Sequence, residues 1–388
     1  MGVNELLAEI AGIGRDPETG GYRRFSFTPV DDELRRWFTA KAAERDLEVE
    51  TDRNGNLWAW WGDPQADGAI ATGSHLDSVP EGGAFDGPLG IASAFAAIDL
   101  LQNQRPQSQK PLAVVAFGEE EGSRFGVACL GSRLLSGAIA PDVARRLTDP
   151  EGVSFADAFT TAGHDAAQMG PDPTRAHGLD AFVELHIEQG RGLIDLDSPI
   201  AIGTSIWPHG RWRLDFAAKA DHAGTTRMED RTDPMPALAE TVTAVTRSAR
   251  QLGARATFGR IHLSPNASNA IPARLSAWLD LRAIDEATIW RVLEEVTADG
   301  ISEESLTPAI AFDPGLVERM SVALGHPPRL PTAAGHDAGI LAMGDIPTAM
   351  IYVRNPTGVS HSPREHATPQ DCEAGVQALV KVLVELGV

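Results

Sequence analysis

The pattern of apolar positions alternates between short runs and longer helical periods in the first half of the chain. Several short runs have the length and β-branched content of buried strands. One helix start is marked by Thr28 as a cap and Pro29 at the first position. The predicted strands are 47–51, 57–61, 69–73, 112–117 and 180–187, and the predicted helices are 28–46, 89–101, 128–136 and 155–160. This alternation predicts an α/β fold with a mostly parallel sheet covered by helices.

A different pattern begins after Trp207-Pro208. Strands at 212–218 and 275–283, with helices at 234–252 and 286–297, are typical of an α+β unit whose antiparallel sheet is apolar on one side. From Leu316 the α/β style returns. We therefore expect a main domain in two parts, residues 1–208 and 316–388, with an inserted domain at 209–315.

Several apolar runs are followed at once by side chains of the kinds that bind metals. His75 follows residues 68–74, the three glutamates Glu119–Glu121 follow residues 111–117, and His186 ends the next strand. The carboxyl ends of parallel strands meet at one edge of a sheet, where active sites of α/β proteins collect. The sequence therefore predicts a cation site at this edge.

The candidate ligands are imidazoles and carboxylates. Such a set suits Zn²⁺, Mn²⁺, Co²⁺ or Ni²⁺, and one carboxylate can bridge two ions. Glu120 and Glu121 do not easily serve one metal from a single strand face, so one can ligate while its neighbour acts as a general base. Asp77 points the same way as His75 and is placed to accept its second N–H. The candidates are His75, Asp86, Glu120, Glu121, His186 and His361.

Composition narrows the class of protein. The formal charge of −21, from 33 basic and 54 acidic residues, disfavours nucleic-acid binding. Cys129 and Cys372 are too few for a disulfide framework or a thiolate zinc site, which suits a reducing cytoplasm. The N-terminus lacks a signal-peptide pattern, and no uncharged apolar stretch approaches about 18 residues. We predict a soluble cytoplasmic protein with no membrane association.

The ordered motifs together resemble the amidase branch of the M20 dinuclear metallohydrolases, which holds N-carbamoyl-L-amino acid hydrolases, allantoate amidohydrolases and β-ureidopropionase-type enzymes. The resemblance covers nearly the whole chain. The matching motifs are Gly73-Ser-His-Leu-Asp-Ser, Gly83-Ala-Phe-Asp-Gly-Pro-Leu-Gly90, Glu120-Glu-Gly-Ser-Arg-Phe125, Glu184-Leu-His-Ile-Glu-Gln-Gly190, Asp221-His-Ala-Gly-Thr-Thr226, Asn269-Ala-Ile-Pro272, Asp280-Leu-Arg282, Gly335-His-Asp-Ala338 and Gly358-Val-Ser-His-Ser-Pro363.

This resemblance implies two divalent metal ions that share Asp86. One ion would have His75 and His186 as its other ligands, and the second would have Glu121 and His361. Glu120 would be the base that activates water. The main domain would then be the catalytic domain.

The inserted domain resembles the lid and dimerisation domain of the family, which implies a homodimer. His222 matches the histidine that reaches across the dimer to polarise the scissile carbonyl. Asn269 and Arg282 match groups that hold the substrate carboxylate, and Gln189 and His336 match further substrate contacts. Thr-Arg-Met at 226–228 departs from the Thr-Pro-Met that is commoner in the family, so the resemblance does not extend to the geometry of this loop.

The implied reaction is hydrolysis of a linear ureido C–N bond in a small carboxylate, either an N-carbamoyl-L-amino acid or allantoate. A dipeptidase or N-acyl-amino acid deacylase of the same superfamily is an alternative. The presence of His186 and the short spacing from His75 to Asp86 count against it. A non-catalytic binding protein on the same fold is a second alternative, and Glu120 with its full ligand set argues against that.

Overall fold

The computed structural model describes residues 1–104 and 110–388. These residues form two compact units, one made of Met1–Ser205 with Ala311–Val388 and the other of Ile206–Ile310. The predicted boundary after residue 315 falls inside helix α11 (Pro314–Leu324), which the side chain of Asp313 caps. In the structure, the second unit instead ends at Ile310, which is four residues before that helix begins.

A mixed sheet forms the centre of the first unit. Among the described residues its strand order is β1-β2-β4-β3-β5-β15-β6-β13, and β14 pairs with β6. The central strands β4, β3, β5 and β15 are parallel, whereas β1, β2 and β6 join by antiparallel pairing. The strands are β1 (Glu48–Thr51), β2 (Leu57–Trp61), β3 (Ala69–His75), β4 (Leu112–Phe117), β5 (Leu179–Ile187), β6 (Ile200–Ile206), β13 (Ile310–Ala311), β14 (Arg329–Thr332) and β15 (Thr348–Val353).

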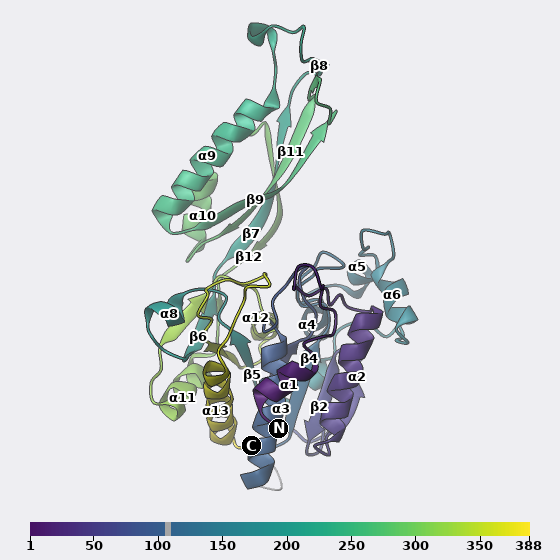
Figure 1. Cartoon of the computed structure of the whole chain (residues 1–388), viewed down its shortest axis with the longest axis vertical. Helices are drawn as coiled ribbons and strands as arrows, with labels where there is room; N and C mark the ends of the chain where they lie inside the picture. The colour runs from purple at the N-terminus through teal and green to yellow at the C-terminus, as the bar shows by residue number, and fades with distance from the viewer. Residues whose placement is uncertain (105–109) are drawn as a thin grey trace. The chain divides into compact units, whose positions relative to one another are not determined.

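Helices cover both faces of this sheet, so the predicted α/β class is confirmed (Figure 1). α3 and α13 pack on each other over β3, β5 and β15, and α4 packs on α12, which contacts β5 and β15. No described helix is long and apolar enough to cross a lipid bilayer. The helices are α1 (Val3–Glu9), α2 (Pro29–Ala43), α3 (Pro88–Gln104), α4 (Leu130–Ser136), α5 (Pro141–Arg145), α6 (Phe155–Thr161), α7 (Pro173–His177), α8 (Gly192–Asp195), α11, α12 (Asp337–Met343) and α13 (Pro369–Leu386).

Local sequence explains how these elements begin and what they bury. The Thr28 side chain accepts a hydrogen bond from the N–H of Asp31, which caps α2. α3 is buried along most of its length, as expected for a helix with apolar or small residues on every side. In β3, a Cβ at Gly73 would lie 1.9 Å from the carbonyl oxygen of Val115. Only glycine therefore lets β3 pair closely with β4 and bring His75 to the end of the strand.

The second unit is a four-stranded antiparallel sheet with the order β12-β7-β11-β9, and α9 and α10 cover one face (Figure 1). Side chains of β11 alternate between buried and half-buried, which gives the one-sided pattern predicted from the sequence. Leu214, Leu279 and Ile289 belong to its core. Its elements are β7 (His209–Ala217), β8 (Asp221–His222), η1 (Met228–Asp230), α9 (Pro234–Leu252), β9 (Arg255–Ser264), β10 (Ala270–Ile271), β11 (Arg274–Arg282), α10 (Glu286–Leu293) and β12 (Gly300–Thr307).

Candidate metal centre and active site

Three parallel strands deliver the predicted ligands to one edge of the sheet. β3 ends at His75, β4 ends just before Glu119–Glu121, and His186 is the penultimate residue of β5. Because β4, β3 and β5 are neighbours and run parallel, their carboxyl ends lie side by side. Asp86 joins them from the loop that leads into α3.

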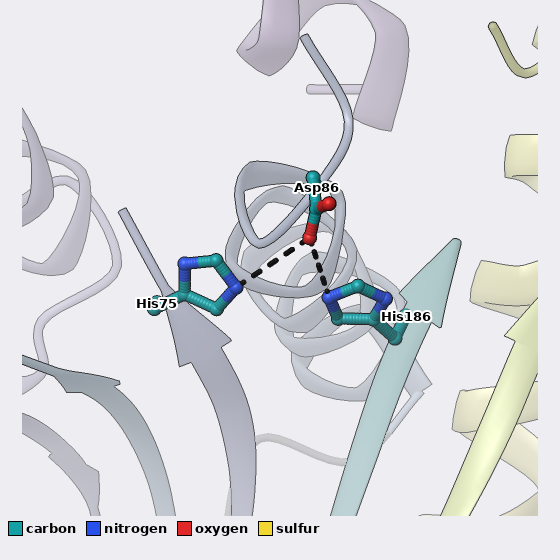
Figure 2. Close-up of side chains that lie close together, drawn as sticks. All are labelled: His75, Asp86 and His186. Atoms are coloured by element: carbon teal, nitrogen blue, oxygen red, sulfur yellow. Dashed lines mark ion pairs between the residues drawn. The ribbon is translucent and has the colours of Figure 1, made fainter. Parts of the chain in front are cut away.

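His75 and His186 flank the carboxylate of Asp86 (Figure 2). The Asp86 Oδ1 atom lies 3.7 Å from Nε2 of His75 and 3.1 Å from Nε2 of His186. All three residues are buried, and neither Nε2 atom has a hydrogen-bond partner in the part of the chain that the structure describes. A buried nitrogen without a partner is costly, and a cation between these atoms would satisfy both imidazoles. The residues therefore fit a metal ion.

The second nitrogen of each imidazole fixes the tautomer. His75 Nδ1 lies 3.1 Å from the carbonyl oxygen of Asp77, and His186 Nδ1 lies 2.8 Å from the carbonyl oxygen of Ile187. A carbonyl oxygen only accepts, so each Nδ1 carries the hydrogen and each Nε2 presents a lone pair. The Asp77 carboxylate also approaches His75 Nδ1, at 3.5 Å.

A second group of ligand atoms gathers around the other oxygen of Asp86. His361 Nε2 lies 3.5 Å from Asp86 Oδ2 and 3.5 Å from Glu121 Oε2. Asp86, Glu121 and His361 form one candidate metal group, and His75, Asp86 and His186 form another. Each oxygen of Asp86 thus faces a different set, which is the arrangement of a carboxylate that bridges two ions.

Glu365 and Ser360, which the sequence reasoning missed, hold Asp86 in place. Glu365 Oε1 accepts the backbone N–H groups of Phe85 and Asp86, both at 2.9 Å. The hydroxyl of Ser360 donates to Asp86 Oδ2 at 3.0 Å. Burial and the charge of Asp86 raise the pKa of Glu365 to about 7. The only available signal was their closeness to His361, since Ser360 lies within the last motif and Glu365 follows its end by two residues.

Gln189, predicted to contact substrate, lies against the same carboxylate. Its Nε2 group donates to Asp86 Oδ2 at 2.8 Å. Its Oε1 atom is buried and has no hydrogen-bond partner within residues 1–104 and 110–388. Gln189 therefore braces Asp86 through one end of its amide and presents an acceptor at the other.

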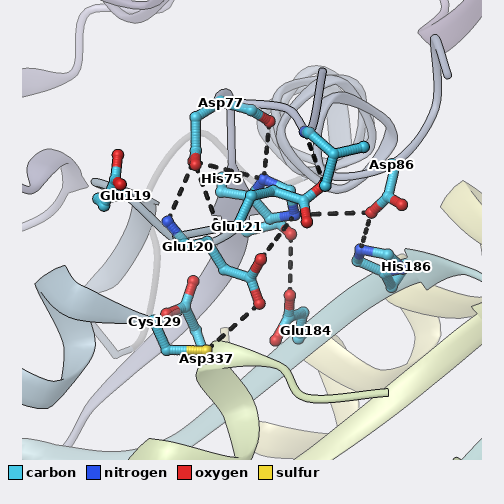
Figure 3. A network of polar contacts seen from close by, with 12 residues as sticks. His75, Asp77, Asp86, Glu119, Glu120, Glu121, Cys129, Glu184, His186 and Asp337 are labelled. Atoms are coloured by element: carbon cyan, nitrogen blue, oxygen red, sulfur yellow. Dashed lines mark hydrogen bonds and ion pairs between the residues drawn. The ribbon is translucent and has the colours of Figure 1, made fainter. Parts of the chain in front are cut away.

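The side chains of Glu120 and Glu121 take different positions (Figure 3). The Asp77 carboxylate accepts both of their backbone N–H groups, at 3.2 Å and 3.0 Å. Glu120 is 5% exposed, and its Oε2 atom lies 3.6 Å from Nε2 of His75. Burial raises the pKa of Glu120, and the imidazole of His75 opposes this shift. Glu121 instead faces His361.

Glu119 is a buried anchor of the same loop. Its Oε1 atom accepts the N–H groups of Arg124 and Phe125, at 2.9 Å and 2.8 Å. Burial raises its pKa to about 7. Glu119 therefore fixes the shape of the loop that carries Glu120 and Glu121.

His336 lies beside His186, with the two ring centroids 4.5 Å apart. Glu184, His186 and His336 form a third group with ligand atoms close together. The Glu184 oxygens already accept hydrogen bonds from Ser74 Oγ and from the N–H of Ala338, at 2.8 Å and 3.0 Å. These two hydrogen bonds hold the Glu184 side chain in place beneath the ligand cluster. Burial keeps the pKa of His336 well below its usual value.

The other three predicted site residues belong to the second unit. Pairing of β8 with β10 brings the exposed His222 and Asn269 close together in that unit. His222 Nδ1 accepts the N–H groups of Gly224 and Thr225, so its Nε2 carries the hydrogen. Arg282 lies at the end of β11, where its Nε and Nη2 atoms donate to Asp280 at 2.9 Å and 3.3 Å.

Comparison with known proteins decides the family. The profile of peptidase family M20/M25/M40 matches residues 71–385. The chain belongs to this family. M20 proteins are metallohydrolases, in accord with the candidate ligand groups that share Asp86.

The similarity of this M20 chain to individual proteins extends over its whole length. It is 35% identical to the N-carbamoyl-L-amino acid amidohydrolase of Geobacillus stearothermophilus, over 98% of this chain and 97% of that protein. It is 31% identical to the allantoate amidohydrolase of Escherichia coli (strain K12), over 99% and 97%. The crystal structure of an amidase of the hydantoinase/carbamoylase family from Burkholderia vietnamiensis matches with a TM-score of 0.86 and 29% identity, over 99% and 96%. These findings confirm the resemblance to the amidase branch and do not favour the peptidase, deacylase or non-catalytic alternatives.

Proposed function

We propose that this chain hydrolyses the linear ureido C–N bond of a small carboxylate, with two divalent cations of Zn²⁺, Mn²⁺, Co²⁺ or Ni²⁺ per subunit. The observation that carries the proposal is the position of Asp86, whose two oxygens face two different ligand sets. The amidohydrolase names of the full-length relatives support the ureido group as the target.

His75, Asp86 and His186 would hold one cation, and Asp86, Glu121 and His361 the other. Bound there, the cations supply Lewis acidity that acidifies water and polarises the ureido carbonyl. Glu120 takes a proton from the attacking water and returns it to the nitrogen that leaves. The reaction consumes one water, breaks one C–N bond and releases an amine with a carbamate, which decomposes to CO₂ and ammonia.

Residues of the second unit supply substrate recognition in this proposal. His222 carries a hydrogen on Nε2, so it is equipped to donate to the oxygen that gains charge during attack. Arg282 recognises the substrate carboxylate, for which a bidentate guanidinium is suited. Asp280 holds this guanidinium in a fixed orientation. Gln189 of the first unit adds one more contact. Its Oε1 atom, which is buried and has no hydrogen-bond partner among the described residues, accepts a substrate N–H.

The test is a side-by-side turnover assay of the purified protein. Allantoate, N-carbamoyl-L-amino acids, N-carbamoyl-β-alanine, dipeptides and N-acetyl-amino acids are each supplied with Mn²⁺, Co²⁺, Ni²⁺ or Zn²⁺, and ammonia and free amine are measured. We expect ammonia from at least one ureido compound, loss of turnover after chelation, and recovery when metal is returned. Absence of ammonia from every ureido compound, or amine released only from peptides or acyl amino acids, would overturn the proposal.

The ratio of kcat/KM between allantoate and N-carbamoyl-L-amino acids would choose the substrate within this class. The homodimer and the cytoplasmic location predicted from the sequence are part of the same proposal. Analytical ultracentrifugation tests the dimer directly, and a single monomeric species at assay concentration would count against it.

A further inference from the structure

The thiol of Cys129 lies beside the carboxyl group of Glu120 (Figure 3). Its Sγ atom is 3.3 Å from Glu120 Oε1, and the two residues are 2% and 5% exposed. A thiol is the donor in such a contact and the carboxylate oxygen is the acceptor. The other oxygen, Oε2, faces Nε2 of His75 instead. The two oxygens of Glu120 therefore have different neighbours.

The backbone pins Cys129 to the loop that carries Glu120. The N–H groups of Cys129, Leu130 and Gly131 donate to the carbonyl oxygens of Glu120, Glu119 and Gly118, at 2.6, 3.0 and 2.9 Å. A Cβ at Gly131 would lie 2.8 Å from the Gly118 oxygen, so this approach requires glycine. The thiol is thus held at a fixed place relative to the Glu120 side chain.

The surroundings of Cys129 keep its thiol protonated. Burial and the neighbouring carboxylates of Glu120 and Asp337 raise its pKa well above the usual value. The Ser132 hydroxyl holds the Asp337 carboxylate in the same buried cluster. A protonated thiol remains a hydrogen-bond donor and is a poor metal ligand and nucleophile.

We infer that Cys129 is a positioning residue whose S–H group holds Oε1 of Glu120 and leaves Oε2 to exchange the proton with water. The inference rests on the proposed role of Glu120 as the base. Without the thiol, Oε1 loses this donor and the carboxyl group rotates more freely, so fewer molecules hold Oε2 toward the water.

Infrared spectroscopy tests the contact without any assay of activity. Cys129 and Cys372 are the only cysteines, so Cys372→Ala leaves the Cys129 thiol as the sole source of the S–H stretching band. Hydrogen bonding lowers the frequency of this band. Adding Glu120→Ala to Cys372→Ala should shift it to higher frequency. A band that is the same in both proteins would overturn the inference.

Kinetics test the consequence for catalysis. Relative to Cys129→Ser, which keeps a donor, we expect Cys129→Ala to lower kcat about 5-fold, the effect of one weak hydrogen bond, with KM unchanged. The matched control is Cys372→Ala, because Cys372 is also a buried cysteine but lies in α13, and this variant should leave kcat unchanged. Equal kcat for the alanine and serine variants of Cys129 would overturn the inference. If the native chain hydrolyses no ureido compound, the proposed function fails, whereas the infrared comparison still decides whether the thiol holds Glu120.

Discussion

The metal-ligand cluster and the predicted substrate-binding residues of the second unit differ in how they are held. Three ligands of the cluster, His75, Asp86 and His186, are at most 4% exposed, whereas the fifth ligand, His361, is exposed like His222 and Asn269 of the second unit. The cluster is braced over long sequence distances, for example by Glu365, which accepts the N–H of Asp86, 279 residues away. In contrast, Arg282 is held by Asp280, two residues away on the same strand.

This difference suggests a division of labour between the two regions. A buried cluster whose atoms are fixed by several partners is preorganised for one chemical task. A substitution of an exposed side chain that is held by a single turn or strand does not disturb a buried core. We therefore expect variants of the cluster to affect kcat and metal binding, and variants of the second unit to affect KM and substrate choice.

The largest effect should come from Glu120→Gln, which removes the base and keeps the shape of the side chain. We expect kcat to fall about 10³-fold, the middle of the range for loss of general acid–base catalysis. Metal content, measured by elemental analysis, should match the native protein because Glu120 is not among the candidate ligands. A kcat within about ten-fold of the native value would contradict its role as the base.

A smaller effect is expected from Arg282→Met. Loss of a bidentate contact to the substrate carboxylate should reduce kcat/KM about 100-fold, mainly through KM. Arg282→Lys should recover only part of this, because an ammonium keeps the charge without the planar fork.

Arg274→Met is the matched control for this variant, since Arg274 lies at the other end of β11 on the same face of the sheet. Steady-state kinetics on the preferred ureido compound should show native values for it. Similar losses in the Arg274 and Arg282 variants would remove the case for a specific carboxylate site.

The smallest effect should come from Glu365→Ala, which tests whether long-range bracing matters. Losing the acceptor for the N–H groups of Phe85 and Asp86 should weaken metal affinity about 10-fold, measured by competition with a chelator. Glu365→Gln keeps an acceptor oxygen and should bind metal nearly as the native protein does.

Glu373→Ala removes an exposed glutamate from α13 and serves as the control. The Tm of each metal-free variant separates a loss of affinity from a loss of fold. If the Glu365→Ala variant bound metal as tightly as the Glu373→Ala variant, the hydrogen bonds from Glu365 would not contribute to metal affinity.

Much of the fold follows from local pattern. The predicted limits of β2, β4 and α9 agree with the structure because each has strong apolar periodicity and clear end signals. The predicted helix at 28–46 ends earlier, at Ala43, because the chain turns there before β1. Strand β9, which the sequence reasoning did not find, is a mostly exposed edge strand. A bulge at Gly259 breaks its apolar alternation between Phe258 and Ile261, which hides the period of two.

By itself, the sequence determined the kinds of metal-binding side chain and their places at strand ends, because strand periodicity and motif spacing are local properties. Only the tertiary structure decided which oxygen of Asp86 faces which ligand set, and that Glu365 and Cys129 support Asp86 and Glu120. Those contacts depend on the order of strands in the sheet and on the path of distant loops. The order of strands and the path of distant loops cannot be read from neighbouring residues, because these side chains meet through packing and not through their spacing along the chain.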